Sequence, residues 1–248
     1  MTRVDLNCDL GEGAGHDADL MPLITSANIA CGAHAGDAAT MRETIALAQK
    51  HGVAIGAHPG FSDREHFGRR ELAIAPMNVA ELVLNQIQTL QVTVMEFGAR
   101  MTHVKLHGAL YNMAARDADL ADSITKAIWV TDFDPLIYVP WGSELAKAAQ
   151  RNGLRIANEV FADRTYQRDG SLTPRSRPDA LITDEDAAVA QVLRMVREGV
   201  VRATDGTDVP IAADTVCLHG DGPHAVAFAH RLRKELATAG VAVKAFGA

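Results

Sequence analysis

The sequence predicts an α/β fold, and within that class a distorted TIM-like (β/α) barrel with seven or eight parallel strands. The first reason is that amphipathic segments with helical spacing alternate with short β-branched segments along the whole chain. The second is a repeated junction, in which a glycine ends a helical segment and an apolar strand follows: Gly52, Gly153 and Gly240. The third is that no Pro- or Ser-rich linker divides the 248 residues, so we expect one barrel domain over residues 1–248.

Each element of this barrel can be placed on the chain. We expect strands at Arg3–Cys8, Ser26–Ala30, His103–Leu106, Leu136–Val139 and Thr215–Leu218, and further strands directly after the three junction glycines. Apolar residues three and four apart predict long helices over residues 78–98 and 184–198. The stretch DRTYQRDGSLTPRSRPDALI, residues 163–182, reads as a long loop, and loops of this length usually serve as lids or binding loops.

Composition narrows the class of protein. The chain carries 24 Lys and Arg against 31 Asp and Glu, a net charge of -7, which argues against nucleic acid or an anionic membrane surface as a partner. The cysteines are Cys8, Cys31 and Cys217, an odd number without C-x-x-C spacing, which is typical of a reducing compartment. No apolar stretch is long enough for a membrane span. We therefore expect a cytoplasmic protein.

Polar residues fall on one face of several predicted strands. Side chains alternate between the two faces of a strand, so three sets of polar residues are each aligned: Asp5, Asn7 and Asp9; His103, Lys105 and His107; Thr215, Cys217 and His219. If the apolar faces pack under the helices, these sets point into the barrel. Many of the polar residues lie at the carboxyl ends of the strands, where active sites of such barrels are found.

This pattern predicts a site at that end of the barrel. The residues expected to surround it are Asp9, His34, His58, His107, Glu159, His219 and Asp221. Lys105 is costly to bury without an anionic partner, which Asp9 or its neighbours on the first strand could provide. Asp5 lies lower on that strand, so we assign it a structural role. The alternative is that the histidines are hydrogen-bonded structural residues and Lys105 belongs to a structural ion pair.

The chemistry indicated is general acid–base hydrolysis of a small acidic substrate. The chain has no G-x-S-x-G elbow, no P-loop and no H-E-x-x-H motif. The glycine-rich stretch LGEGAGHD could contact an anion, but by itself it is a weak signal. The favoured interpretation uses no metal. A metal triad of Asp9, His34 and His58, as in barrel deacetylases, is the alternative.

Several blocks, in order along nearly the whole chain, resemble the LamB/YcsF family, the A subunits of prokaryotic ATP-dependent 5-oxoprolinases. The blocks are DLNCDLGEG, SANIACGAHAGD, GVAIGAHPGFSDREHFGR, HVKLHGALYN, EVFADRTY, DGSLTPRSRPDALI and TVCLHGDG. The family commonly has proline where Leu106 stands, and we expect that side chain to face away from the lumen. The resemblance implies a barrel of the glycoside hydrolase/deacetylase type.

The resemblance also implies a reaction. The family cleaves 5-oxo-L-proline to L-glutamate with ATP hydrolysis, together with B and C subunits. A five-membered lactam is a poor electrophile, and phosphorylation of its amide oxygen would create a leaving group before water attacks. Because this chain has no P-loop, we expect activation to take place at least partly on the partner subunits. Whether ATP binds this chain, and whether a divalent metal takes part, stays open at this point.

Roles can then be assigned to the candidate residues. We expect Asp9 or His58 to be the general base, Lys105 to stabilise negative charge, and His107 with His219 to donate to or orient the substrate. Residues expected to bind the substrate are Asn7, His34, Glu159, Arg164, Arg175, His219 and Asp221, with one of the arginines on the substrate carboxylate. The rival functions are a metal-dependent deacetylase or amidohydrolase without ATP, and a non-catalytic ligand-binding scaffold.

Overall fold

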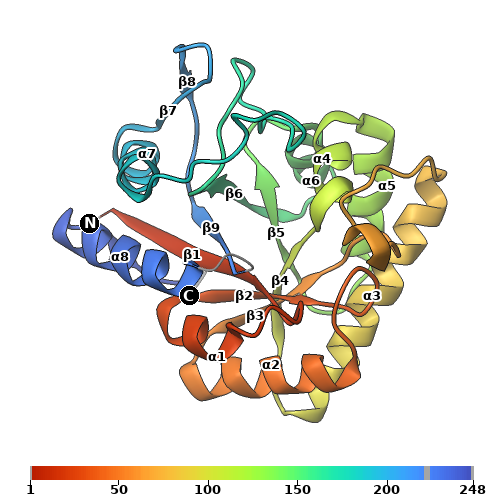
Figure 1. The fold of residues 1–248 in the computed structure, drawn as a ribbon. Coiled ribbons are helices and arrows are strands. Elements are labelled where there is room, and N and C mark those ends of the chain that lie inside the picture. Colours follow the sequence, from red (N-terminus) through yellow and green to blue (C-terminus); the bar gives the residue numbers. More distant parts are fainter. Residues whose placement is uncertain (1, 221–223, 247–248) are drawn as a thin grey trace.

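A closed ring of seven parallel strands forms the centre of the computed structural model, which describes residues 2–220 and 224–246 (Figure 1). Neighbours in the ring follow the order of the chain, and β9 pairs with both β6 and β1 to close it. The strands are β1 (Arg3–Leu10), β2 (Ser26–Ala30), β3 (Ala54–His58), β4 (Met101–Lys105), β5 (Leu136–Pro140), β6 (Arg155–Phe161) and β9 (Thr215–His219). The predicted parallel barrel is confirmed.

The remaining strands lie outside the ring. The short β10 (Ala242–Val243) follows the third junction glycine and pairs with the start of β1. The strands β7 (Val200–Arg202) and β8 (Asp208–Pro210) form an antiparallel hairpin that the strand prediction missed. Figure 1 shows this hairpin projecting beyond α7, away from the ring.

Helices cover the outside of the barrel (Figure 1). They are α1 (Asp17–Leu20), α2 (Ala38–His51), α3 (Pro76–Glu96), α4 (Gly108–Arg116), α5 (Ala118–Trp129), α6 (Glu144–Arg151), α7 (Glu185–Glu198) and α8 (Ala225–Thr238), with 3₁₀ turns at Met21–Leu23 and Arg64–His66. The Asp37 and Asp184 carboxylates accept backbone N–H bonds at the starts of α2 and α7, while Gly52 and Gly199 end those helices with positive φ. None of the helices in the described part of the chain is long and apolar enough to cross a membrane.

Two kinds of packing separate the outside of the barrel from its lumen. Val4, Leu6 and Cys8 of β1 are buried in the hydrophobic core with the apolar helix faces. The opposite face of β1 points into the lumen, where Asp5 accepts hydrogen bonds from the hydroxyls of Thr25, Ser26, Tyr138 and Thr215, at 2.5–3.0 Å. The lumen is therefore filled by a hydrogen-bonded polar layer, and this layer supports the carboxyl end of the strands from below.

One glycine shows how tightly this layer is packed. The imidazole of His103 stacks on the ring of Tyr138, and its Nε2 lies 2.9 Å from Asn28 Oδ1. A Cβ at Gly56 of β3 would lie 2.1 Å from that same Nε2. Position 56 therefore has to be glycine because the space a side chain needs is occupied by an aromatic ring from the next strand.

Candidate active site

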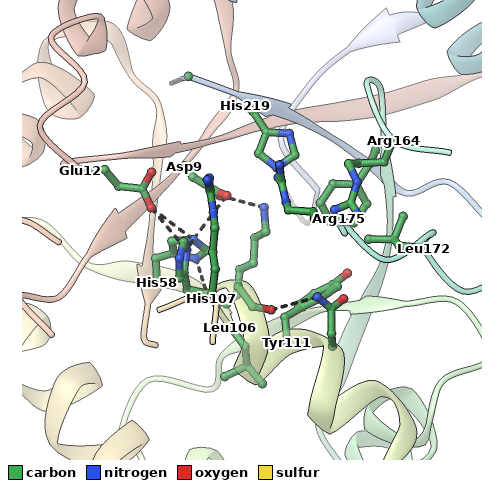
Figure 2. Close-up of a pocket in the computed structure, with 16 residues that line it drawn as sticks. Asp9, Glu12, His58, Leu106, His107, Tyr111, Arg164, Leu172, Arg175 and His219 are labelled. Carbon is green, nitrogen blue, oxygen red and sulfur yellow. Dashed lines mark hydrogen bonds and ion pairs between the residues drawn. The ribbon is translucent and has the colours of Figure 1, made fainter. Parts of the chain in front are cut away.

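A pocket opens at the carboxyl ends of the strands, where the alternation of polar residues predicts it (Figure 2). Residues that line it and that were expected at the site are Asp9, His58, Lys105, His107, Arg164, Arg175 and His219. They come from β1, β3, β4, the end of β9, the loop after β6 and the segment after β4, so only the folded barrel brings them together.

Lys105 is the central charge of the site. Its Nζ lies 2.8 Å from Asp9 Oδ1 and 2.9 Å from Glu159 Oε1, and 3% of its side chain is exposed. Burial alone would lower the pKa of Lys105, but Asp9 and Glu159 outweigh burial and hold that pKa well above its usual value. The ammonium is therefore a permanent cation held between two carboxylates.

Asp9 contacts a lysine and a histidine. Besides Lys105, its Oδ2 lies 3.3 Å from His58 Nε2. Burial would raise the pKa of Asp9, but His58 and Lys105 hold it well below its usual range, so the carboxylate is ionised. Burial lowers the pKa of His58, but the neighbouring Asp9 carboxylate raises it by more. The pKa of His58 therefore lies above its usual value. Asp9 and Lys105 thus place one negative and one positive group side by side at the pocket.

Four side chains converge on the other side of Asp9. His58 Nε2 lies 2.9 Å from His107 Nδ1, and Glu12 Oε1 lies 3.1 Å from His34 Nε2 and 3.4 Å from His107 Nδ1. One donor atom from each of Glu12, His34, His58 and His107 lies within 4.8 Å of the others. The alternative metal triad of Asp9, His34 and His58 differs from this group: Asp9 Oδ2 lies 3.3 Å from His58 Nε2, but a donor atom of Asp9 converges with those of Cys217 and His219.

Glu12 was not predicted as a site residue. It follows β1 in the glycine-rich stretch noted in the sequence, and Figure 2 shows its carboxylate directed toward His58 and His107. The available signal was a carboxylate between two glycines just after a strand whose end was already assigned to the site. The direction taken by the loop could not be read from the sequence.

A second chain of contacts borders the pocket at β9. His219 Nδ1 donates to Asp163, whose carboxylate oxygens both lie 2.8 Å away, and His219 Nε2 lies 3.1 Å from an Arg175 guanidinium nitrogen. Burial would raise the pKa of Asp163, but His219 outweighs it and lowers that pKa. Arg175 belongs to the predicted loop 163–182, so this loop does reach the site.

Among the described residues, the others expected to bind the substrate make hydrogen bonds within the protein. Arg164 lines the pocket, but it donates to the carbonyls of Thr173 and Ala180 and so holds its own loop together. Asn7 is fully buried and donates to Glu159 and Thr215. Neither Asn7, His34 nor Glu159 is among the pocket-lining residues, and Asp221 lies outside the described residues.

Tyr111 and Leu106 are among the pocket-lining residues that were not assigned a role from the sequence. Tyr111, at the start of α4, lines the pocket, and burial together with the Glu159 charge raises its pKa well above the usual value. Leu106 also lines the pocket and is 1% exposed, and Figure 2 shows its side chain directed away from Asp9. Tyr111 could be found only once α4 was placed directly above the end of β4.

The fold and the site together define a (β/α)-barrel protein with a cluster of carboxylates, histidines and one buried lysine at the carboxyl end of its strands. The chain belongs to the LamB/YcsF family, whose model matches residues 4–248, and the predicted membership is confirmed. It is 54% identical to the 5-oxoprolinase A subunit of Bacillus subtilis (strain 168), over 99% of this chain and 97% of the relative.

A second relative and a solved structure are consistent with this family membership. The chain is 56% identical to the 5-oxoprolinase A subunit of Geobacillus kaustophilus (strain HTA426), over 99% of this chain and 97% of that protein. The crystal structure of a lactam utilization protein from Thermus thermophilus superposes with a TM-score of 0.92 at 45% identity. That match covers 98% of this chain and 100% of the other.

Proposed function

We propose that this chain is the A subunit of an ATP-dependent 5-oxoprolinase, which opens 5-oxo-L-proline to L-glutamate with ATP hydrolysis and acts with B and C subunits. The geometric observation that carries the proposal is the buried Lys105 cation between Asp9 and Glu159 at the pocket. The proposal is supported by 54% and 56% sequence identity, over nearly the full length of the chain, to relatives named as the A subunits of 5-oxoprolinases.

The reaction has two stages. Transfer of the terminal phosphoryl group of ATP to the amide oxygen leaves ADP and an activated lactam with a good leaving group. Water then adds to the carbon that carries this oxygen, and the ring C–N bond breaks as the nitrogen takes up a proton, which leaves an acyl phosphate of glutamate. A second water hydrolyses this acyl phosphate to glutamate and phosphate. We assign the second stage to this barrel and the first at least partly to the partner subunits, because the chain has no P-loop.

The pocket residues fit the hydrolytic stage. Asp9 or His58 accepts the proton from the attacking water, and Lys105 stabilises the negative charge that develops on the substrate oxygens. Arg175 is better placed than Arg164 to bind the substrate carboxylate, because Arg164 already donates to two loop carbonyls. His219, held by Asp163, orients the substrate next to Arg175.

The test is reconstitution with the two partner subunits. We expect release of glutamate and ADP from 5-oxoproline and ATP, and we expect Asp9→Asn to abolish glutamate release. The matched control is Glu43→Gln, an exposed carboxylate on α2. Full activity of both the Asp9→Asn and the His58→Gln complexes would make this chain a scaffold, and turnover without ATP would make it an amidohydrolase of another type.

A further inference from the structure

Glu12, His34, His58 and His107 form a cluster, and two of its histidines contact backbone carbonyl oxygens on the side away from the cluster centre. These contacts determine which ring nitrogen carries the hydrogen. His58 Nδ1 lies 2.8 Å from the Lys105 carbonyl oxygen, and His107 Nε2 lies 2.8 Å from the Phe67 carbonyl oxygen. A carbonyl oxygen can only accept a hydrogen bond, so each of these outer nitrogens carries the hydrogen. A neutral imidazole has one such hydrogen. The inner nitrogens, His58 Nε2 and His107 Nδ1, are then both acceptors.

Those two inner nitrogens face each other across 2.9 Å. Two lone pairs at that distance repel unless a positive charge lies between or beside them. Glu12 adds a third acceptor, because its Oε1 lies 3.4 Å from His107 Nδ1 and 3.8 Å from His58 Nε2. Since all three side chains are largely withdrawn from solvent, water cannot screen this concentration of acceptor atoms. The cluster therefore requires a positive charge, either a metal ion or an additional proton on one of the rings.

We propose that Glu12, His34, His58 and His107 bind one divalent first-row transition-metal ion. Three imidazoles and one carboxylate form a ligand set that such ions prefer, whereas Mg²⁺ and Ca²⁺ prefer oxygen ligands. Metal-binding histidines typically donate their other ring N–H to a carboxylate or a backbone carbonyl. His58 and His107 both show this arrangement.

Close packing holds the histidine rings of the cluster in place. The rings of His34 and His107 stack with centroids 3.7 Å apart, and both lie against the backbone of two glycines. A Cβ at Gly60 would lie 2.9 Å from His34 Nδ1, and a Cβ at Gly68 would lie 3.0 Å from His107 Cδ2. Any side chain at either position would displace the rings. His34 Nδ1 is also buried without a hydrogen-bond partner among the described residues.

The spacings of the donor atoms are compatible with one shared ion. With metal–nitrogen distances of about 2.1 Å, tetrahedral angles separate two nitrogens by about 3.4 Å and right angles by about 3.0 Å. His58 Nε2 and His107 Nδ1 are 2.9 Å apart, and Glu12 Oε1 lies 3.4 Å from His107 Nδ1 and 3.8 Å from His58 Nε2. This range of spacings admits ions with four, five or six ligands, such as Zn²⁺, Co²⁺ or Mn²⁺.

The inference rests on the contacts of the four side chains and stands independently of the proposed substrate. It does change one assignment. A metal-bound His58 cannot accept a proton from water, so Asp9 would be the general base. The competing occupant of the cluster is a proton on His58, which would make that ring an imidazolium donating to His107 and Asp9.

The test is direct binding of Co²⁺ to chelator-treated protein, followed by calorimetry and by visible ligand-field absorption. We expect one equivalent to bind with an absorption change. We expect Glu12→Gln and His107→Gln each to weaken binding at least about tenfold, since even outer contacts of metal ligands are worth 10–100-fold. His51→Gln, which removes an exposed histidine at the end of α2, should bind as the parent does.

Two results would overturn the proposal. One is the absence of saturable binding of Co²⁺, Mn²⁺ and Zn²⁺ to the parent protein, together with ring nitrogen NMR shifts that identify His58 as an imidazolium. The other is binding unchanged in Glu12→Gln, which lies in a loop and should fold even if His107→Gln does not. Neither result bears on lactam hydrolysis, because glutamate release by the reconstituted complex is measured separately.

Discussion

Lys105 shows how one buried residue connects the stability of the barrel to its chemistry. Its ammonium is paired with Asp9 and Glu159, and Nζ lies 5.4 Å from the centroid of the Phe161 aromatic ring. Removing one partner of a buried ion pair leaves an uncompensated charge, which is more costly than never having had the pair. The two carboxylates would face this situation if Lys105 were neutral.

For Lys105→Met we expect glutamate release by the reconstituted complex to fall about 10²–10³-fold, because a fixed donor to the developing charge is lost. The free energy of unfolding should fall by about 3–5 kcal/mol, with the barrel still folded at room temperature. Kinetics and circular dichroism melts check the two effects. The control is Lys147→Met, an exposed lysine on α6. Near-normal turnover would leave Lys105 as a purely structural ion-pair member.

Asp5 is expected to act on stability alone. Asp5→Asn keeps the shape of the side chain but replaces one acceptor oxygen with an amide donor. Hydroxyl groups of the polar layer in the lumen then lose their acceptor. We expect the free energy of unfolding to fall by about 1–3 kcal/mol and the Tm by several degrees. Activity per folded molecule should be unchanged, because Asp5 does not line the pocket. A fully stable but inactive variant would instead place Asp5 in the chemistry.

The effect of Asp5→Asn should also depend on pH. Burial raises the pKa of Asp5, and its hydroxyl partners offset this only in part. The folded protein then holds the proton more tightly than the unfolded chain, so Asp5 contributes stability below pH 3.8 that is lost as the pH rises through its folded pKa. The amide of the variant does not titrate and has no such dependence. Urea denaturation from about pH 4 to 7 should show the gap between parent and variant narrowing; a constant or widening gap would contradict this.

At the scale of single residues, the sequence predicted whatever depends on strand alternation. Asp9, His58, Lys105 and His107 lie around one pocket because a two-residue period decides which face of a strand a side chain occupies. Residues on loops have no such period. Glu12 was missed for this reason, and Arg164 was expected on the substrate although loop carbonyls bind it.

Among the elements, the loop 163–182 brings Arg175 to the pocket and Arg164 into its own interior. Bridges from Arg164 to Leu181 and from Tyr166 to Leu172 and Ala203 fix this loop against itself and against the β7–β8 hairpin. The predicted binding loop is therefore an ordered extension with internal pairing. Its conformation carries one guanidinium to His219.

Arg175→Met should raise the KM of the reconstituted complex for 5-oxoproline about 10–100-fold, since a hydrogen bond to a charged group contributes about 1.5–3 kcal/mol. Thermal stability should change little. Arg168→Met removes an exposed arginine of the same loop and is the matched control. An unchanged KM would exclude Arg175 as the carboxylate-binding residue. Steady-state kinetics and thermal melts of both variants provide the comparison.

The helices and strands themselves were largely predictable, because helical and strand periods differ and glycine marks the junctions. The hairpin β7–β8 was missed although the Asp205-Gly206 pair is a typical hairpin turn. Its strands have only three residues each, too few for alternation to be visible. The need for glycine at position 56 was also hidden, since it depends on His103 from the next strand.

On the scale of the whole molecule, we expect this chain to depend on its partners. Because the sequence has no phosphate-binding loop, the purified chain should release little or no glutamate from 5-oxoproline and ATP, while the complex with both partner subunits should do so. A coupled assay for glutamate and ADP on equal amounts of chain checks this. Robust turnover by the chain alone would place the ATP site here.

The closing pair of the ring, β1 with β9, also has a consequence for how the protein is made. β1 ends at Leu10 and β9 begins at Thr215, so the ribosome must complete residues 11–214 before β1 has its second neighbour. Until then the polar lumen face of β1 and one of its backbone edges lie open, and open strand edges invite wrong pairing. A stalled or truncated chain would therefore be an aggregation hazard that chaperones have to shield. Of the seven strands of the ring, β1, which supplies Asp9, is synthesised first and is among the last to gain all its neighbours.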